Sequence, residues 1–146
     1  MSLFKTLTIS FVTTIICLPL CTVEAGDLTI INNTGHDSTS VINNGPCSAN
    51  ILGDVGITHA HTTNVVPETT VIKACIFNKS NCTAAVHMTN NCSGPVVATV
   101  VLDVKKGIKE IRSSSTSEGY VMSGSNFTAT LEGGPTHQTW LQYFAN

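Results

Sequence analysis

The sequence predicts an all-β domain, a small antiparallel β-sandwich of about seven or eight short strands braced by disulfide bonds. A small β-barrel is the alternative arrangement of the same strands. Short runs rich in Val, Ile and Thr are separated by clusters of Asn, Gly and Pro. No segment of helical periodicity separates these runs, which excludes a fold of alternating strands and helices. Four of the six cysteines lie beyond residue 25, an even number that is typical of an exported, disulfide-braced domain.

The first 25 residues have the organisation of a secretory signal peptide. Lys5 supplies the positive charge, 7–20 is an apolar stretch without charge, and Val23 and Ala25 occupy the positions that signal peptidase inspects. The apolar stretch is shorter than the ~20 residues that a membrane-spanning helix needs. We therefore expect removal of residues 1–25 and no transmembrane segment in the mature protein.

Removal of such a segment predicts an exported protein, either secreted or periplasmic. A lipoprotein anchored through Cys21 is the minor alternative, because Leu20 is bulkier than the small residue that precedes a lipidated cysteine. The mature chain is predicted to form a single all-β domain over 26–135. Residues 136–146 form a C-terminal aromatic segment that packs on this domain or is partly disordered. The short signal with one lysine favours a bacterial source.

The predicted strands follow the apolar runs in order. They are 28–31, 40–42, 71–77, 82–88, 96–104, 108–112, 120–122 and 127–131. The first two runs end at Asn-rich turns. The run 96–104 has Val at five of nine positions and is predicted to be a central strand buried on both faces. Lys105, Lys106 and Gly107 form the turn after it. The last two runs are predicted to form a hairpin around 123–126.

The four remaining cysteines allow three disulfide connectivities, and their spacing favours one of them. Cys75 and Cys82 flank a six-residue segment with a polar end, which is typical of a hairpin closed by a cross-strand bridge. This pairing leaves Cys47 to bond with Cys92. Zinc binding is the rival interpretation of four cysteines, but the chain has no CxxC pair and its compartment is oxidising.

His59 and His61 are the sharpest candidates for a metal site. Residues two apart on a strand project to the same face, so both imidazoles would reach one Zn or Cu ion. Further ligands would come from His36, Asp37, Asp54, Glu68 or His87. The alternative is two polar side chains on an exposed strand or loop, and no other cofactor is indicated.

Catalytic motifs are missing from the sequence. It contains no GxSxG, HExxH, P-loop or dinucleotide-binding pattern, so we expect a protein that is not an enzyme. With 11% charged residues and a formal net charge of −2, the chain also offers no electrostatic footprint for nucleic acid. The basic cluster around Lys105 and Lys106 is interpreted as a solvated hairpin tip and not as an anion site.

Trp140, Tyr143 and Phe144 form an aromatic cluster near the C-terminus. They either close the sandwich or form an exposed patch for a partner. Taken together, the sequence predicts a small exported binding, accessory or inhibitory module whose partner is a protein or a glycan. A secreted metal-binding protein that uses His59 and His61 is the alternative function.

Overall fold

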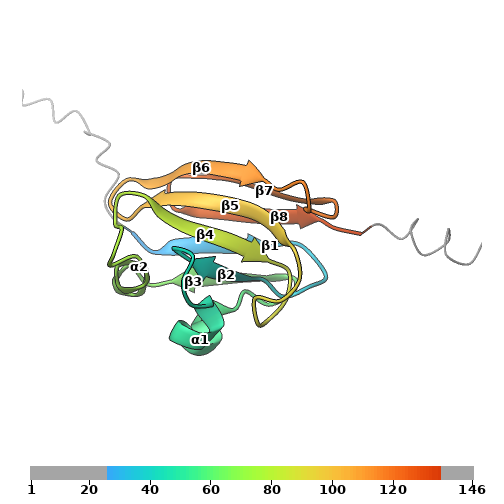
Figure 1. Cartoon of the computed structure of the whole chain (residues 1–146), viewed down its shortest axis with the longest axis horizontal. Coiled ribbons are helices and arrows are strands. Elements are labelled where there is room, and N and C mark those ends of the chain that lie inside the picture. Colours follow the sequence, from blue (N-terminus) through green and yellow to red (C-terminus); the bar gives the residue numbers. More distant parts are fainter. Residues whose placement is uncertain (1–25, 136–146) are drawn as a thin grey trace, which may run out of the picture.

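Two four-stranded sheets face each other in the computed structural model, which describes residues 26–135 (Figure 1). One sheet has the strand order β3–β1–β8–β7 and the other β2–β4–β5–β6. The strands are β1 (Leu28–Asn32), β2 (Thr39–Ile42), β3 (Thr62–Val66), β4 (Cys82–His87), β5 (Val96–Asp103), β6 (Gly107–Ser113), β7 (Tyr120–Ser125) and β8 (Thr128–Gly133). The predicted sandwich is confirmed, and the sheets do not close into a barrel. The predicted signal peptide and the C-terminal aromatic segment lie outside the described residues.

One strand pair departs from the antiparallel prediction. β1 pairs with β8 in parallel, with Thr29 opposite Thr128 and Asn32 opposite Leu131. The other strand pairs are antiparallel. A parallel pair needs a crossover connection instead of a tight turn, and here the whole second sheet lies between the two strands in the sequence. The first and last described strands are therefore neighbours.

The sandwich core consists of two clusters of buried side chains. One contains Val66, Val71, Cys75, Cys82, Leu102 and Val104, and the other contains Val86, Met88, Val97, Val100, Tyr120 and Leu131. Leu131 is fully buried at 0% exposure. β5 contributes to both clusters and lies inside its sheet, with buried residues at consecutive positions such as Val100 and Val101. The prediction of a central, largely buried strand is confirmed.

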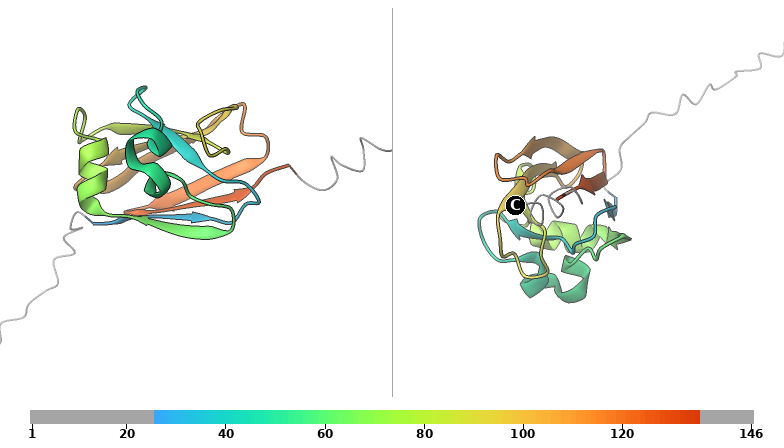
Figure 2. Two further views of the ribbon diagram at one scale, coloured as in Figure 1. Left: turned by 90° about the horizontal axis from the view of Figure 1, so that it is seen from below. Right: turned by 90° about the vertical axis from the view of Figure 1, so that its right-hand side faces the viewer.

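The sequence prediction of a strand over 71–77 is wrong. Residues 68–74 form the helix α2 (Glu68–Ala74), which follows Pro67 and closes one end of the sandwich (Figure 2). Proline favours the start of a helix, and Val71 and Cys75, one helical turn apart, are both buried. This burial outweighs the preference of the β-branched residues for a strand.

Three further elements were not predicted. They are α1 (Ser48–Leu52), the 3-10 helix η1 (Gly53–Gly56) and β3. α1 begins immediately after Cys47, beside the turn that ends β2. In that turn Asn43 and Asn44 have φ of 49° and 55°, and the amide of Gly45 donates to the carbonyl of Ile42 at 2.8 Å. Asparagine tolerates this left-handed conformation well, so the Asn-rich turn after β2 is confirmed.

The β5–β6 and β7–β8 hairpins are found where the sequence places them. β6 starts directly after the Lys105–Lys106 turn, and β7 and β8 pair around Asn126. Both hairpin turns lie at the same end of the sandwich, because the amide of Ile108 donates to the carbonyl of Asn126 at 2.6 Å. Among residues 26–135, no helix is long and apolar enough to cross a membrane.

Candidate functional site

Two disulfide bonds join segments that flank strands of the β2–β4–β5–β6 sheet. Cys47 is bonded to Cys92 with a Cα–Cα distance of 5.9 Å, and Cys75 to Cys82 with one of 5.4 Å. This is the pairing predicted from the cysteine spacing. The hairpin that motivated it is absent, since Cys75 follows a helix and only Cys82 begins a strand.

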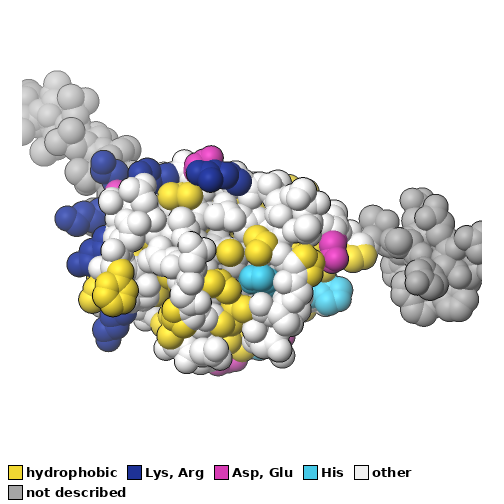
Figure 3. All heavy atoms as spheres, in the orientation of Figure 1, with side chains coloured by type: hydrophobic (Ala, Val, Ile, Leu, Met, Phe, Trp, Pro, Cys, Tyr) yellow, Lys and Arg dark blue, Asp and Glu magenta, His cyan; other side chains and the backbone are white. Residues whose placement is uncertain are grey.

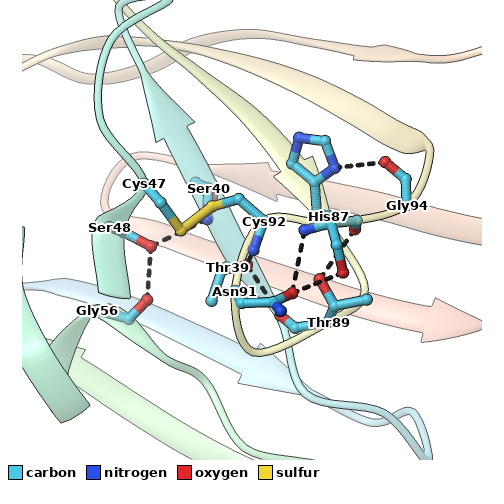
Figure 4. The surroundings of a disulfide bond; sticks show 11 residues. Thr39, Ser40, Cys47, Ser48, Gly56, His87, Thr89, Asn91, Cys92 and Gly94 are labelled. Atoms are coloured by element: carbon cyan, nitrogen blue, oxygen red, sulfur yellow. Dashed lines mark hydrogen bonds between the residues drawn. A yellow bond between two sulfur atoms is a disulfide. The ribbon is translucent and has the colours of Figure 1, made fainter. Parts of the chain in front are cut away.

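The Cys47–Cys92 bond is surrounded by buried hydroxyl groups that join separate loops (Figure 4). The hydroxyl of Thr39 donates to the carbonyl of Thr89 at 2.8 Å and accepts from the amide of Cys92 at 2.9 Å. The hydroxyl of Ser48 accepts from the amide of Ser40 at 3.0 Å and donates to the carbonyl of Gly56 at 2.6 Å. Together with the disulfide, these hydrogen bonds hold the loops around it in place, which is a structural role.

The Cys75–Cys82 bond closes the loop between α2 and β4, and this loop lies among basic residues. Lys73, Lys79, Lys105, Lys106 and Lys109 are all exposed. Two contacts place the loop against the β5–β6 turn. The amide of Val104 donates to the carbonyl of Lys79 at 2.9 Å, and Nζ of Lys109 donates to Oδ1 of Asn81 at 2.6 Å. The dark blue side chains gathered at one end in Figure 3 show this concentration of positive charge.

Two large apolar side chains protrude from the same loop. Phe77 is 96% exposed and Ile76 is 56% exposed, although the flanking cysteines are buried. We call the loop 76–81 together with the five lysines the basic tip. Soluble proteins expose single apolar residues freely, but Ile76 and Phe77 are adjacent and protrude together from a cationic surface, which makes this loop the candidate binding site.

Asp103 organises the turn within the basic tip. Its carboxylate accepts from the amides of Lys105 at 2.8 Å and Lys106 at 3.1 Å. The hydrogen bond from the Lys105 amide, with the second one from Lys106, lowers the pKa of Asp103 below its ordinary value. The carboxylate is thus committed to the backbone, and no ion pair among residues 26–135 involves any of the five lysines.

His59 lies away from the basic tip and contacts two carboxylates. Its Nε2 lies 2.9 Å from Oδ1 of Asp54, and its Nδ1 lies 3.4 Å from Oδ2 of Asp37. The hydrogen bond to Asp54, followed by the one to Asp37, raises the pKa of His59 above 6.5. His59 and His61 belong to a turn before β3 and not to a strand, and His61 has a φ of 55°. The alternation expected of a strand does not apply to them.

The other proposed metal ligands are placed separately. Nδ1 of His36 lies 2.9 Å from the hydroxyl of Tyr120, and Nδ1 of His87 lies 3.0 Å from the carbonyl of Gly94. Glu68 begins α2. Within 26–135, no three His, Cys, Asp or Glu side chains are grouped so that they could hold a metal ion. The geometry therefore gives the metal-binding hypothesis no support in this part of the chain.

The pKa of His59 directly tests the contacts of its imidazole with Asp54 and Asp37. We expect NMR titration to give a pKa above 6.5 for His59, with Asp54→Asn lowering it more than Asp37→Asn. Because the folded state favours the protonated imidazole, its stabilising contribution is complete below pH 6.5. It disappears as the pH rises through the raised value. A His59 pKa unaffected by both substitutions would contradict the assignment.

A cavity of about 110 Å³ lies between the two sheets. Its apolar lining includes Ile30, Leu52, Val66, Val86, Val100 and Met122. The polar groups at its wall are already engaged, since Nδ2 of Asn64 donates to the carbonyl of Val55 at 2.9 Å and Ser48 bonds to Gly56. No buried side-chain N or O atom in the described chain lacks a hydrogen-bond partner. The cavity therefore offers hydrophobic contact alone.

Sequence reasoning missed the central residues of the basic tip. It found Lys105 and Lys106 but interpreted them as a solvated turn, and it assigned Phe77 to a strand. The available signal was a short cysteine-closed segment that contains adjacent large apolar residues. The predicted partner-binding residues Trp140, Tyr143 and Phe144 lie outside the described residues.

Comparison with known proteins gives one family and one similar structure. The family model described as "NttC: T2SS substrate NttC" matches residues 1–136. The crystal structure of the Legionella pneumophila type II secretion system substrate NttC superposes with a TM-score of 0.59. The two chains are 24% identical, and the match covers 75% of this chain and 98% of that one. This likeness shows a shared fold. No curated protein matches the sequence.

Proposed function

Because the chain belongs to the NttC family of type II secretion system substrates, we propose that it acts outside the producing cell as a binding module. Its binding surface in this proposal is the basic tip. Membership of the family already implies an exported protein. The signal peptide proposed for residues 1–25 and two disulfides fit passage through an oxidising periplasm.

The observation that carries the proposal is the position of Phe77. This side chain is 96% exposed and therefore contributes almost nothing to the sandwich core. It is held on a loop closed by the Cys75–Cys82 bond, so little conformational entropy is lost when a partner covers it. An aromatic side chain presented in this way is the type of residue that dominates binding energies.

The lysines of the basic tip add the second property of a binding surface. They create a local positive potential on a chain whose formal net charge is −2. Complementary charge accelerates encounter with a negative partner and fixes the orientation in which contact is made. The partner in this proposal therefore carries negative charge at its surface.

We expect the Phe77→Ser variant of the exported protein to lose binding to cells. Fluorescently labelled protein is incubated with a panel of washed eukaryotic and bacterial cells, and bound label is measured by flow cytometry. Loss of a central aromatic contact should weaken binding about tenfold or more. Val121→Ser is the matched control, because Val121 is likewise an exposed apolar residue, at 56%, but lies at the other end of its hairpin from the basic tip.

Equal loss of binding in both variants, or no loss in Phe77→Ser, would contradict the assignment of the basic tip. Both variants are expected to keep the unfolding midpoint of the parent protein, since both side chains are exposed. Robust turnover in a hydrolase screen that is abolished by one Ser, His or Asp substitution would replace binding with catalysis.

A further inference from the structure

We propose that the negatively charged partner is an anionic phospholipid membrane, with Ile76 and Phe77 inserted at the interface and the surrounding lysines on the headgroups. This inference rests on the proposed function and names the partner of the same surface. Apolar insertion and a polybasic patch are the two contributions that together give stable attachment to a membrane surface. The basic tip supplies both at one end of the molecule.

The apolar contribution comes from two adjacent residues that project from one short loop. Cys75 and Cys82, at the two ends of the loop, are 3% and 2% exposed and belong to the core. Their disulfide bond has a sequence separation of only 7, so the loop between them cannot retreat far from the surface. Ile76 and Phe77 are consequently presented as a fixed wedge.

The electrostatic contribution comes from three different segments. Lys73 belongs to the last turn of α2, Lys79 to the disulfide loop, and the remaining lysines to the β5–β6 hairpin. Each lysine near an anionic surface contributes about fivefold in affinity at moderate ionic strength. Asp103, the carboxylate in the β5–β6 turn, accepts hydrogen bonds from backbone amides there. It offsets part of the positive charge but leaves the lysine side chains unpaired within 26–135.

The distribution of carboxylates contributes to a difference in charge between the two ends of the sandwich. Glu132 lies opposite Val121 at the open end of the β7–β8 hairpin, and Glu118 precedes this hairpin nearby. The hairpin's turn lies at the basic tip, so these carboxylates are at the far end. Asp27, Glu68 and Asp103 lie at the basic-tip end, but the five lysines there outnumber these three carboxylates. An anionic surface would therefore attract this end more than the far end, which favours the orientation that places Phe77 at the lipid.

The chemistry of the cations favours a membrane over a protein partner. All the tip cations are lysines, compact charges on flexible stems, whereas recognition of a defined carboxylate or phosphate geometry favours the planar fork of arginine. Arg112 is instead engaged with Glu110, with Nε 2.7 Å from Oε1. The apolar pair also protrudes, which suits insertion into a deformable interface.

Vesicle binding tests this inference on the whole exported protein. Cosedimentation is measured with phosphatidylcholine vesicles and with vesicles that also contain about 30% phosphatidylserine. We expect binding to the anionic vesicles only, and a marked loss when the salt is raised from about 0.1 M to about 0.5 M. Phe77→Ser should weaken binding about tenfold or more, and Lys106→Gln should weaken it about fivefold.

Two control variants separate the tip from general effects of charge and apolarity. Arg112→Gln makes the same change in net charge as Lys106→Gln, but it removes a cation paired with Glu110. Val121→Ser makes an apolar-to-polar change away from the tip. Both should bind anionic vesicles within about twofold of the parent protein. Equal losses in Lys106→Gln and Arg112→Gln would overturn the proposed orientation.

The outcomes distinguish this inference from the proposed function. If anionic vesicles are not bound, or bind no better than neutral ones, the membrane inference is wrong. If binding to cells nevertheless remains sensitive to Phe77→Ser, the proposed function stands and the partner is a protein or glycan, which protease treatment of the cells would reveal. If binding to cells is also insensitive to Phe77→Ser, the proposed function fails as well.

Discussion

Replacing Cys47 and Cys92 together by alanine is expected to lower the free energy of unfolding by about 4 kcal/mol. The bond joins residues 45 positions apart, and it therefore restricts the unfolded chain strongly. The Cys75→Ala/Cys82→Ala variant should lose only about 2.5 kcal/mol, because its closed loop is short. Urea unfolding of the parent protein and both variants under non-reducing conditions measures the difference.

The two disulfide variants should show the opposite order for the loss of binding to cells. Opening the Cys75–Cys82 loop releases Ile76 and Phe77, so binding to cells should fall although the stability loss is smaller. The Cys47–Cys92 bond lies among loops outside the basic tip, so a variant lacking it should bind with unchanged affinity while it remains folded. Equal stability losses, or a weaker binding defect in the short-loop variant, would contradict this division of roles.

Gly107→Ala is expected to destabilise the protein by more than about 2 kcal/mol. Gly107 has a φ of 95°, which L side chains rarely adopt. A Cβ atom there would lie 2.2 Å from the carbonyl oxygen of Asn126. That oxygen accepts from the amide of Ile108, so the clash would disturb the hydrogen bond that joins the two hairpin turns.

Gly94→Ala is the control that separates the clash from the backbone strain. Gly94 also has a positive φ, 78°, but its nearest neighbour would be Cγ2 of Thr89 at 3.8 Å. We expect a loss of about 1 kcal/mol for this variant, from backbone strain alone. Chemical unfolding of both variants measures the two effects. Equal losses would show that the close approach of Asn126 has no energetic consequence.

The cysteine pairing was predictable even though the structure around Cys75 was not. Pairing depends only on whether two sulfur atoms meet, and seven residues allow this through a helix end as easily as through a hairpin. The helix was hidden because Val71 and Ile72 favour strands when judged locally. The burial of Val71 and the partial burial of Ile72, after Pro67, decided the conformation, and burial is a property of the tertiary structure.

The candidate site was harder to predict from the sequence than the cysteine pairing, for a related reason. Apolar runs identify residues that prefer burial, but the run 71–77 contains both buried Val71 and exposed Phe77. Only the position of the helix end distinguishes them. The histidines illustrate the converse, since the two-residue spacing of His59 and His61 has meaning only on a strand. A positive φ at His61 places the pair in a turn.

The parallel pairing of β1 with β8 has a consequence for the order in which the molecule folds. β1 starts at Leu28, yet its partner ends at Gly133, so one ladder of the first sheet forms only when nearly the whole described chain is present. Contacts between such distant segments slow folding and exclude completion of the sandwich from a partial chain. A nascent molecule would therefore stay open while it is still being made. That delay suits an exported protein.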